Sequence, residues 1–152
     1  MIYTSLAKIK ALHPCYTGWK AISRAKEEIR ATQEFPLTDA LESNNLDDVL
    51  WYLGETHCKA VLIAFAEKLV ISPERLEDIT KKATFEIAYK LTTYANELAN
   101  AAAERGYPRT AVAYLQEQDR QKAILREVIT QYGESEQAEQ TNPAITIEGD
   151  QS

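Results

Sequence analysis

Apolar residues recur every three or four positions through most of the chain, which is the spacing of one face of an α-helix. The clearest series begins at Ser72-Pro73-Glu74, where serine can cap a helix, proline suits its first position and glutamate its first turn. Apolar positions then continue at helical spacing to Ala102, which predicts one long helix near residues 73–105. A break at Thr92-Thr93 is an alternative, because β-branched side chains lower helix propensity.

Shorter helical patterns lie on either side of this series. They predict helices over residues 5–12, 15–31, 38–43, 45–54, 59–70 and 110–132. Asn45 is the expected N-cap of one of them and Gly54 its expected end, whereas His13, which precedes a proline, is expected to be extended. The polar stretch 116–122 predicts that the middle of the last helix is exposed or meets a partner.

The segment 36–55 is predicted to be the centre of the fold. Its apolar residues are expected to form interior scaffolding on which the apolar run 60–66 packs; they are Leu41, Leu46, Leu50, Trp51 and Leu53. The chain as a whole is predicted to be all-α, a single-domain bundle of about six helices over residues 1–133. Residues 134–152 contain five acidic residues, no Lys or Arg and no hydrophobic periodicity, so a disordered acidic tail is expected there.

The net charge of −6 is unevenly distributed along the chain. Residues 1–31 carry six basic and two acidic groups, whereas residues 32–80 carry three basic and ten acidic groups. This balance argues against a broad nucleic-acid-binding surface, which needs a basic stripe. No apolar run approaches the length of a membrane span, the N-terminus does not resemble a signal peptide, and two cysteines suit a reducing compartment. We therefore expect a cytoplasmic protein without membrane partners.

Two histidines and two cysteines would match the composition of a zinc site, but their spacing does not. The four residues are His13, Cys15, His57 and Cys58, and the last two are adjacent rather than two to four residues apart. Buried reduced thiols and exposed imidazoles are the favoured interpretation.

The carboxylates of Asp39, Glu42, Asp47 and Asp48 are the remaining chemical candidates. They could hold a divalent cation or exchange protons, but adjacent aspartates in a first helical turn are also explained by the helix dipole. No Gly-rich phosphate loop, HExxH, GxSxG or CxxC motif accompanies them. We therefore predict no catalytic, metal or cofactor site.

Two sequence patterns carry a resemblance to a known family. They are Leu12-His-Pro-Cys-Tyr-Thr-Gly-Trp19, and Pro36-Leu-Thr-Asp-Ala-Leu41 followed by Asn45-Leu-Asp-Asp-Val-Leu-Trp-Tyr-Leu53. Over residues 5–70 the chain resembles small helical proteins of phages, prophages and bacteria, some labelled putative immunity proteins. The resemblance implies a phage-type accessory protein and no particular activity. Its core-defining positions would be Cys15, Gly18, Trp19, Asp48 and Trp51.

The favoured hypothesis is a non-enzymatic protein that binds another protein, such as an immunity or anti-defence partner, through its outer helical faces. The candidate interaction surface comprises Asp39, Glu42, Asp47, Asp48, Glu55, Tyr114, Glu117, Asp119 and Arg120. One alternative is a DNA mimic or a nucleic-acid-associated protein that uses charged helical faces, and another is an enzyme built on Asp47 and Asp48. The alanine-rich stretch 95–103 also suggests a homodimer through paired helices.

Overall fold

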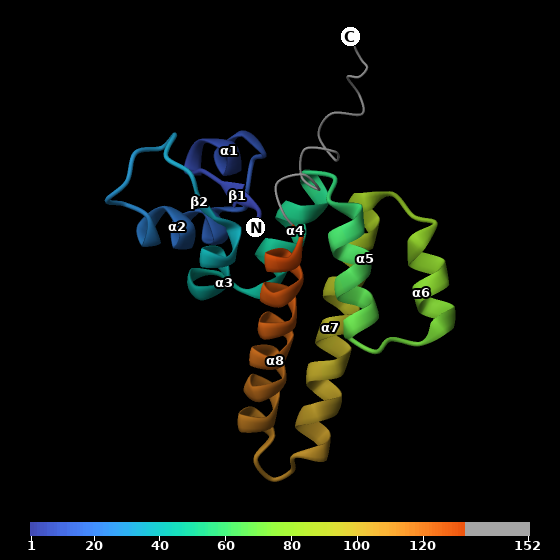
Figure 1. Cartoon of the computed structure of the whole chain (residues 1–152). Helices are drawn as coiled ribbons and strands as arrows, with labels where there is room; N and C mark the ends of the chain where they lie inside the picture. Colours follow the sequence, from blue (N-terminus) through green and yellow to red (C-terminus); the bar gives the residue numbers. More distant parts are fainter. Residues whose placement is uncertain (133–152) are drawn as a thin grey trace.

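The computed structural model describes residues 1–132, which contain eight α-helices, one 3-10 turn and two short strands. The elements are β1 (Tyr3–Thr4), α1 (Leu6–Ala11), α2 (Tyr16–Ala25), β2 (Phe35–Pro36), η1 (Leu37–Asp39), α3 (Ala40–Ser43), α4 (Leu46–Glu55), α5 (Lys59–Lys68), α6 (Pro73–Thr80), α7 (Thr84–Arg105) and α8 (Thr110–Gln131) (Figure 1). The predicted all-α class is confirmed. The predicted acidic tail, 134–152, lies outside the described residues.

The core lies among α4, α5, α7 and α8 (Figure 1). Each of these helices contributes large side chains that are fully buried: Leu50 and Leu53, Leu62 and Phe65, Ile87 and Leu91, and Leu125 and Ile129. Burying one such side chain stabilises the fold by about 1.5–3 kcal/mol. The predicted interior role of the leucines in 41–53 is confirmed, because all four are buried.

The N-terminal third packs beside these helices, with α1, α2 and α3 at the left of Figure 1. Its buried residues, such as Leu6, Ile9 and Ile22, belong to the same hydrophobic core. Its ends are joined by an antiparallel pair of two-residue strands, β1 and β2, in which Thr4 lies opposite Phe35. The buried hydroxyl of Tyr52 on α4 donates a hydrogen bond of 2.7 Å to Thr4 Oγ1, which fixes this third of the chain on α4. Strands this short give no periodic signal, so the sequence pattern did not predict them.

The predicted long helix 73–105 is wrong, because the chain turns between α6 and α7 at residues 81–83. Ala83 has an extended backbone (φ −66°, ψ 152°), while Ile79 at the end of α6 is fully buried. Apolar positions continue at helical spacing across the turn, so periodicity could not reveal it. No break occurs at Thr92-Thr93, where both hydroxyls donate to backbone carbonyls four residues earlier.

Helices α7 and α8 form an antiparallel hairpin that extends below the rest of the molecule in Figure 1. Gly106 ends α7, and a Cβ at that position would lie 2.4 Å from the Cβ of Ala113 on α8. Ala95 and Ala99 are buried in the same contact. Ala101, Ala102 and Ala103 of the same stretch are only half-buried, and the homodimer stays a prediction.

Local signals were right at some helix ends and wrong at others. Asn45 and Ser72 cap α4 and α6 as predicted. His13 is not extended but has a positive φ of 59°. Helix α2 ends at Ala25, not near residue 31. Helix α4 ends at Glu55, one residue after the predicted end at Gly54.

Candidate functional site

A cavity of about 250 Å³ lies between the start of α2 and one side of α4, and we call it the α2–α4 groove. Its walls are mostly apolar and come from residues far apart in the sequence: Ile9, Pro14, Ile22, Leu37, Trp51 and Tyr52. Its polar lining residues are Cys15, Asn44, Asp47 and Asp48, together with the backbone at Gly18. An apolar cleft with a few polar groups is the usual form of a binding site.

The first turn of α2 forms one side of the groove. Cys15 is the N-cap of this helix, and its exposed thiol accepts a 3.4 Å hydrogen bond from the backbone N–H of Gly18. A Cβ at Gly18 would lie 3.0 Å from Oδ2 of Asp48, so glycine allows the carboxylate to sit directly against α2. The prediction that both thiols are buried is therefore wrong for Cys15, because its capping role places it at the surface. It is confirmed for Cys58.

Asn44 joins the two sides of the groove. Its buried Nδ2 group donates to the Gly18 carbonyl and to Asp48 Oδ2, both at 2.9 Å, while its Oδ1 accepts from the hydroxyl of Ser43 at 2.7 Å. Every polar atom of this amide is thus satisfied, as a buried polar group requires. The contact holds α2, α3 and α4 in one arrangement.

The α4 side of the groove carries the two carboxylates of Asp47 and Asp48. Asp48 is half-buried and its backbone N–H donates to Asn45 Oδ1, which starts the helix. Burial raises the pKa of the Asp47 carboxyl above its ordinary value of 3.8, and the neighbouring charge of Asp48 raises it further. Among residues 1–132, no Lys or Arg forms an ion pair with either aspartate. The groove therefore favours a ligand that is cationic as well as apolar.

Most of the other predicted surface residues lie away from this groove. Asp39 forms a 2.6 Å ion pair with Lys26, and Glu42 is exposed on α3. Glu55 lies one turn beyond Trp51 on α4. Only Asp47 and Asp48 of the nine candidates line the α2–α4 groove.

Tyr114 and Asp119 line a second, more polar groove of about 250 Å³ between α4, α7 and α8. Asp47 lies at its edge as well, and Lys122 of α8 also lines it. The Tyr114 hydroxyl donates to Asn96 Oδ1 at 3.0 Å, so this side chain joins α7 to α8. A carboxylate and a lysine from different helices thus share this groove, but no contact between them defines a catalytic pair.

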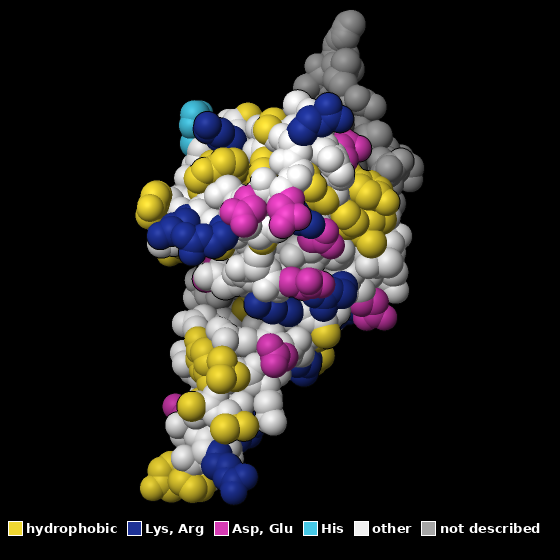
Figure 2. All heavy atoms as spheres, turned by 90° about the vertical axis from the view of Figure 1, so that its left-hand side faces the viewer, with side chains coloured by type: hydrophobic (Ala, Val, Ile, Leu, Met, Phe, Trp, Pro, Cys, Tyr) yellow, Lys and Arg dark blue, Asp and Glu magenta, His cyan; other side chains and the backbone are white. Residues whose placement is uncertain are grey.

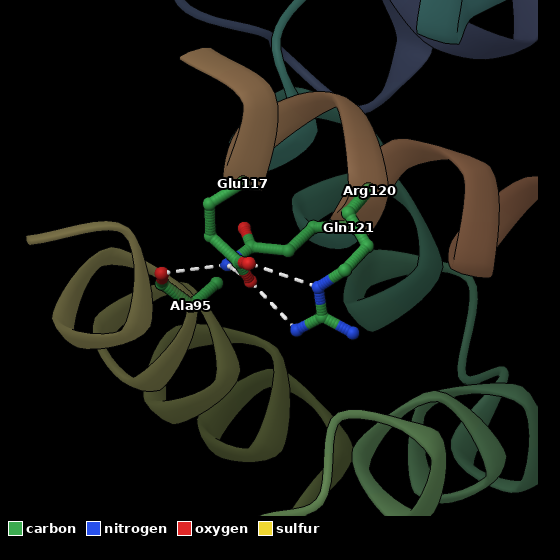
Figure 3. Close-up of polar contacts among 4 residues, drawn as sticks. All are labelled: Ala95, Glu117, Arg120 and Gln121. Carbon is green, nitrogen blue, oxygen red and sulfur yellow. Dashed lines mark hydrogen bonds and ion pairs between the residues drawn. The ribbon is translucent and has the colours of Figure 1, made fainter. Parts of the chain in front are cut away.

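Glu117 and Arg120 belong to a network inside the α7–α8 contact (Figure 3). Arg120 donates to both carboxylate oxygens of Glu117, at 2.8 and 2.7 Å, and this hydrogen bonding lowers the pKa of Glu117. Gln121 is 2% exposed and donates to the Ala95 carbonyl at 2.9 Å and to Glu117 at 3.0 Å. The polar middle of α8 is therefore partly internal rather than wholly exposed, because α7 offers it a carbonyl acceptor.

The histidines take no part in the α2–α4 groove. His13 and His57 are both exposed, as predicted, and neither lines the cavity. Within residues 1–132 the structure brings no three His, Cys, Asp or Glu side chains together in an arrangement suited to a metal ion. The groove can bind a cationic and apolar group, and its lining includes neither a histidine nor a lysine to act as a base.

The expectation that the segment before Gly54 is interior scaffolding needs correction at Trp51. This side chain is only half-buried and lines the groove, while the leucines around it are in the core. Periodicity did not single out Cys15, Gly18 or Asn44, because their roles depend on contacts between distant segments. The five positions that the resemblance gives as core-defining are not all in the core: Gly18 is buried, Trp19, Asp48 and Trp51 are half-buried, and Cys15 is exposed. All of them except Trp19 line the groove.

Charges of both signs occur on the side of the molecule that carries α1, α2 and α3. Figure 2 shows Asp and Glu across the middle of this face, with Lys and Arg between and beside them. The described residues therefore present no continuous acidic surface on this face, and such a surface is what a DNA mimic needs.

No helix in the described part of the chain is long and apolar enough to cross a membrane. Comparisons of the chain with protein-family models, with curated proteins and with solved structures found no match.

Proposed function

We propose that this protein is a non-enzymatic interaction protein that binds a basic, apolar segment of another protein in the α2–α4 groove. The observation that carries the proposal is the combination of mainly apolar walls with two aspartates that form no ion pair with a Lys or Arg of residues 1–132. An aliphatic or aromatic side chain of the partner would fill the cavity, and a neighbouring Lys or Arg would pair with Asp47. Such pairing raises the rate and the specificity of association more than the final affinity.

The accessory role implied by the sequence resemblance, in immunity or anti-defence, is compatible with this proposal. An immunity protein acts by occupying a surface of its partner and needs no chemistry of its own. Four of the five positions singled out by the resemblance, Cys15, Gly18, Asp48 and Trp51, line the groove, so this groove is the first place to look for the partner. The alternative of an enzyme using Asp47 and Asp48 has no support from a neighbouring base in the groove lining.

Paired affinity captures test the proposal. The wild-type protein and an Asp47→Lys variant would be immobilised and exposed to the same lysate, with Glu127→Lys as a matched control on an exposed position of α8. We expect a basic protein that is retained by the wild type and the control, lost with Asp47→Lys, and released as salt is raised. Equal retention by all three proteins would contradict the proposed site.

Chemical blocking of the groove gives an independent test. Cys15 is exposed on the groove while Cys58 is fully buried, so N-ethylmaleimide should modify Cys15 selectively. The adduct would occupy the mouth of the groove and should abolish capture of the same basic protein. Unchanged capture after complete modification would count against the groove as the binding site.

A further inference from the structure

A third cavity lies where α4 crosses α7. Three aromatic residues and one carboxylate line it: Trp51, Phe85, Tyr89 and Glu55. Its volume is about 130 Å³, and Ala88 and Thr92 complete its lining. We call it the aromatic box.

The close approach of two small residues builds the box. Gly54 on α4 faces Ala88 on α7, and a Cβ at Gly54 would lie only 2.8 Å from the Cβ of Ala88. Trp51 and Glu55 stand three residues before and one residue after Gly54. Phe85 and Tyr89 stand in the same relation to Ala88, and positions three or four apart share one face of a helix. The crossing therefore brings these four side chains together.

Two of the three aromatic side chains of the box are exposed, and the third, Trp51, is half-buried. Phe85 is 62% exposed and Tyr89 is 74% exposed, whereas the other two phenylalanines of the chain, Phe35 and Phe65, are buried. Aromatic side chains contribute to binding mainly when a partner buries them. Clusters of exposed aromatic side chains mark interaction sites. This cluster is therefore a candidate for contact with another molecule.

The aromatic rings of the box are among those that have no cation from the described part of the chain over them. Elsewhere, Lys10 lies over Trp19, Lys20 over Tyr16, Lys26 over Phe35 and Arg75 over Tyr94, at 4.5–6.0 Å from the ring centres. Within residues 1–132 no Lys or Arg occupies such a position over Trp51, Phe85 or Tyr89. Glu55 likewise forms no ion pair with the described residues.

We propose that the aromatic box binds an arginine side chain of a partner protein. The guanidinium group is planar, stacks on aromatic rings and donates two parallel hydrogen bonds to a carboxylate, so it matches both the rings and Glu55. A lysine ammonium can use the negative charge but not the stacking or the paired hydrogen bonds. Trp51 lines both cavities, so the arginine would lie next to the segment held in the α2–α4 groove.

The proposal names a feature of the partner and in that respect rests on the proposed function, but it can be tested without the partner. The probe is N-acetyl-arginine amide, titrated into the full-length protein while the indole N–H signals of Trp51 and Trp19 are followed by NMR. We expect a saturable shift of Trp51 with a dissociation constant on the order of millimolar, while Trp19 is unaffected. N-acetyl-citrulline amide, which is nearly isosteric but uncharged, should bind at least about tenfold more weakly.

Three variants locate the binding. Glu55→Gln, Phe85→Leu and Tyr89→Leu change exposed side chains, so the fold should survive, and circular dichroism checks this. Each variant should weaken arginine binding at least about fivefold, and Glu127→Gln on α8 should not change it. N-acetyl-lysine amide should bind more weakly than the arginine probe, because a lysine ammonium cannot donate two parallel hydrogen bonds to a carboxylate.

Several results would overturn the proposal: shifts of Trp51 and Trp19 that remain linear and parallel, equal binding of citrulline and arginine, or unchanged binding by Glu55→Gln. These outcomes differ from failure of the groove. Arginine binding in the box supports the proposal whatever the capture experiment recovers. If a partner protein binds through Asp47 but the arginine probe does not bind, only the proposed arginine site in the aromatic box is overturned.

Discussion

Gly54 and Ala88 are in direct contact where α4 crosses α7, and a methyl group on Gly54 would approach Cβ of Ala88 to 2.8 Å. The Cβ of Ala88 is bonded directly to the backbone of α7 and cannot rotate away, so the helices themselves would have to separate. The closeness of this crossing sets the packing of two central helices and also forms the aromatic box. One glycine thus connects core packing with the candidate binding surface.

Gly54→Ala should destabilise the protein, because the clash outweighs the better helix propensity of alanine, which is about 1 kcal/mol. We expect the free energy of unfolding to fall by about 1–3 kcal/mol in urea titrations. Combining it with Ala88→Gly should recover part of this loss, since removal of the Ala88 methyl makes room. Additive effects of the two substitutions would contradict the close contact.

Asn44→Ala should also destabilise the fold, by about 1–3 kcal/mol. The substitution removes the buried hydrogen bond that Asn44 Nδ2 donates to Asp48 Oδ2. The variant should loosen α2 relative to α4, which would appear as faster amide hydrogen exchange in α2. Asn100→Ala is the matched control, since Asn100 is exposed on α7. Equal stability of the two variants would show that the Asn44 hydrogen bonds contribute little.

Asp47 should make stability depend on pH in a direction opposite to that of most carboxylates. Its pKa is raised above 3.8 in the folded protein, so the folded state holds this proton more tightly than the unfolded chain does. The contribution of Asp47 to stability therefore falls as pH rises from 3.8 through the raised pKa. Asp47→Asn should be more stable than the wild type at pH 7, but only by a few tenths of a kcal/mol, because the side chain of Asp47 is only partly shielded from water. The difference should vanish below pH 3.8.

Glu117 provides the opposite case for the same measurement. Hydrogen bonds from Arg120 lower its pKa below the ordinary value of 4.5. Its stabilising contribution is present above pH 4.5 and is lost as pH falls through the lowered pKa. Glu117→Gln should therefore be less stable than the wild type at pH 7 and approach it in acid. The same sign of effect for both variants at pH 7 would contradict this assignment.

The two thiols should react at very different rates. Cys15 is exposed and Cys58 is fully buried, so an Ellman titration of the native protein should detect one thiol per chain, and a second only after denaturation. Cys15→Ser should remove the fast phase and leave the slow one. Reaction of both thiols at the same rate in the native protein would show that the chain around Cys58 opens readily.

Helix propensity and apolar spacing were enough to predict most of the helices and their buried leucines. A helical bundle is stabilised mainly by burial of the apolar faces of its helices, and the spacing of apolar residues in the sequence shows where those faces lie. Capping residues such as Asn45 and Ser72 act within one turn, which is why the chain around them predicts the helix starts correctly.

Tertiary structure decided what local pattern could not. The turn at 81–83 occurs because α6 must fold back against α5 and α7, and the apolar spacing is the same with or without it. The groove and the box depend on which helices cross and how closely, through Gly18 against Asp48 and Gly54 against Ala88. These close approaches join residues that are about 30 positions apart in the sequence. The spacing of apolar residues along one helix does not show how closely that helix packs against another.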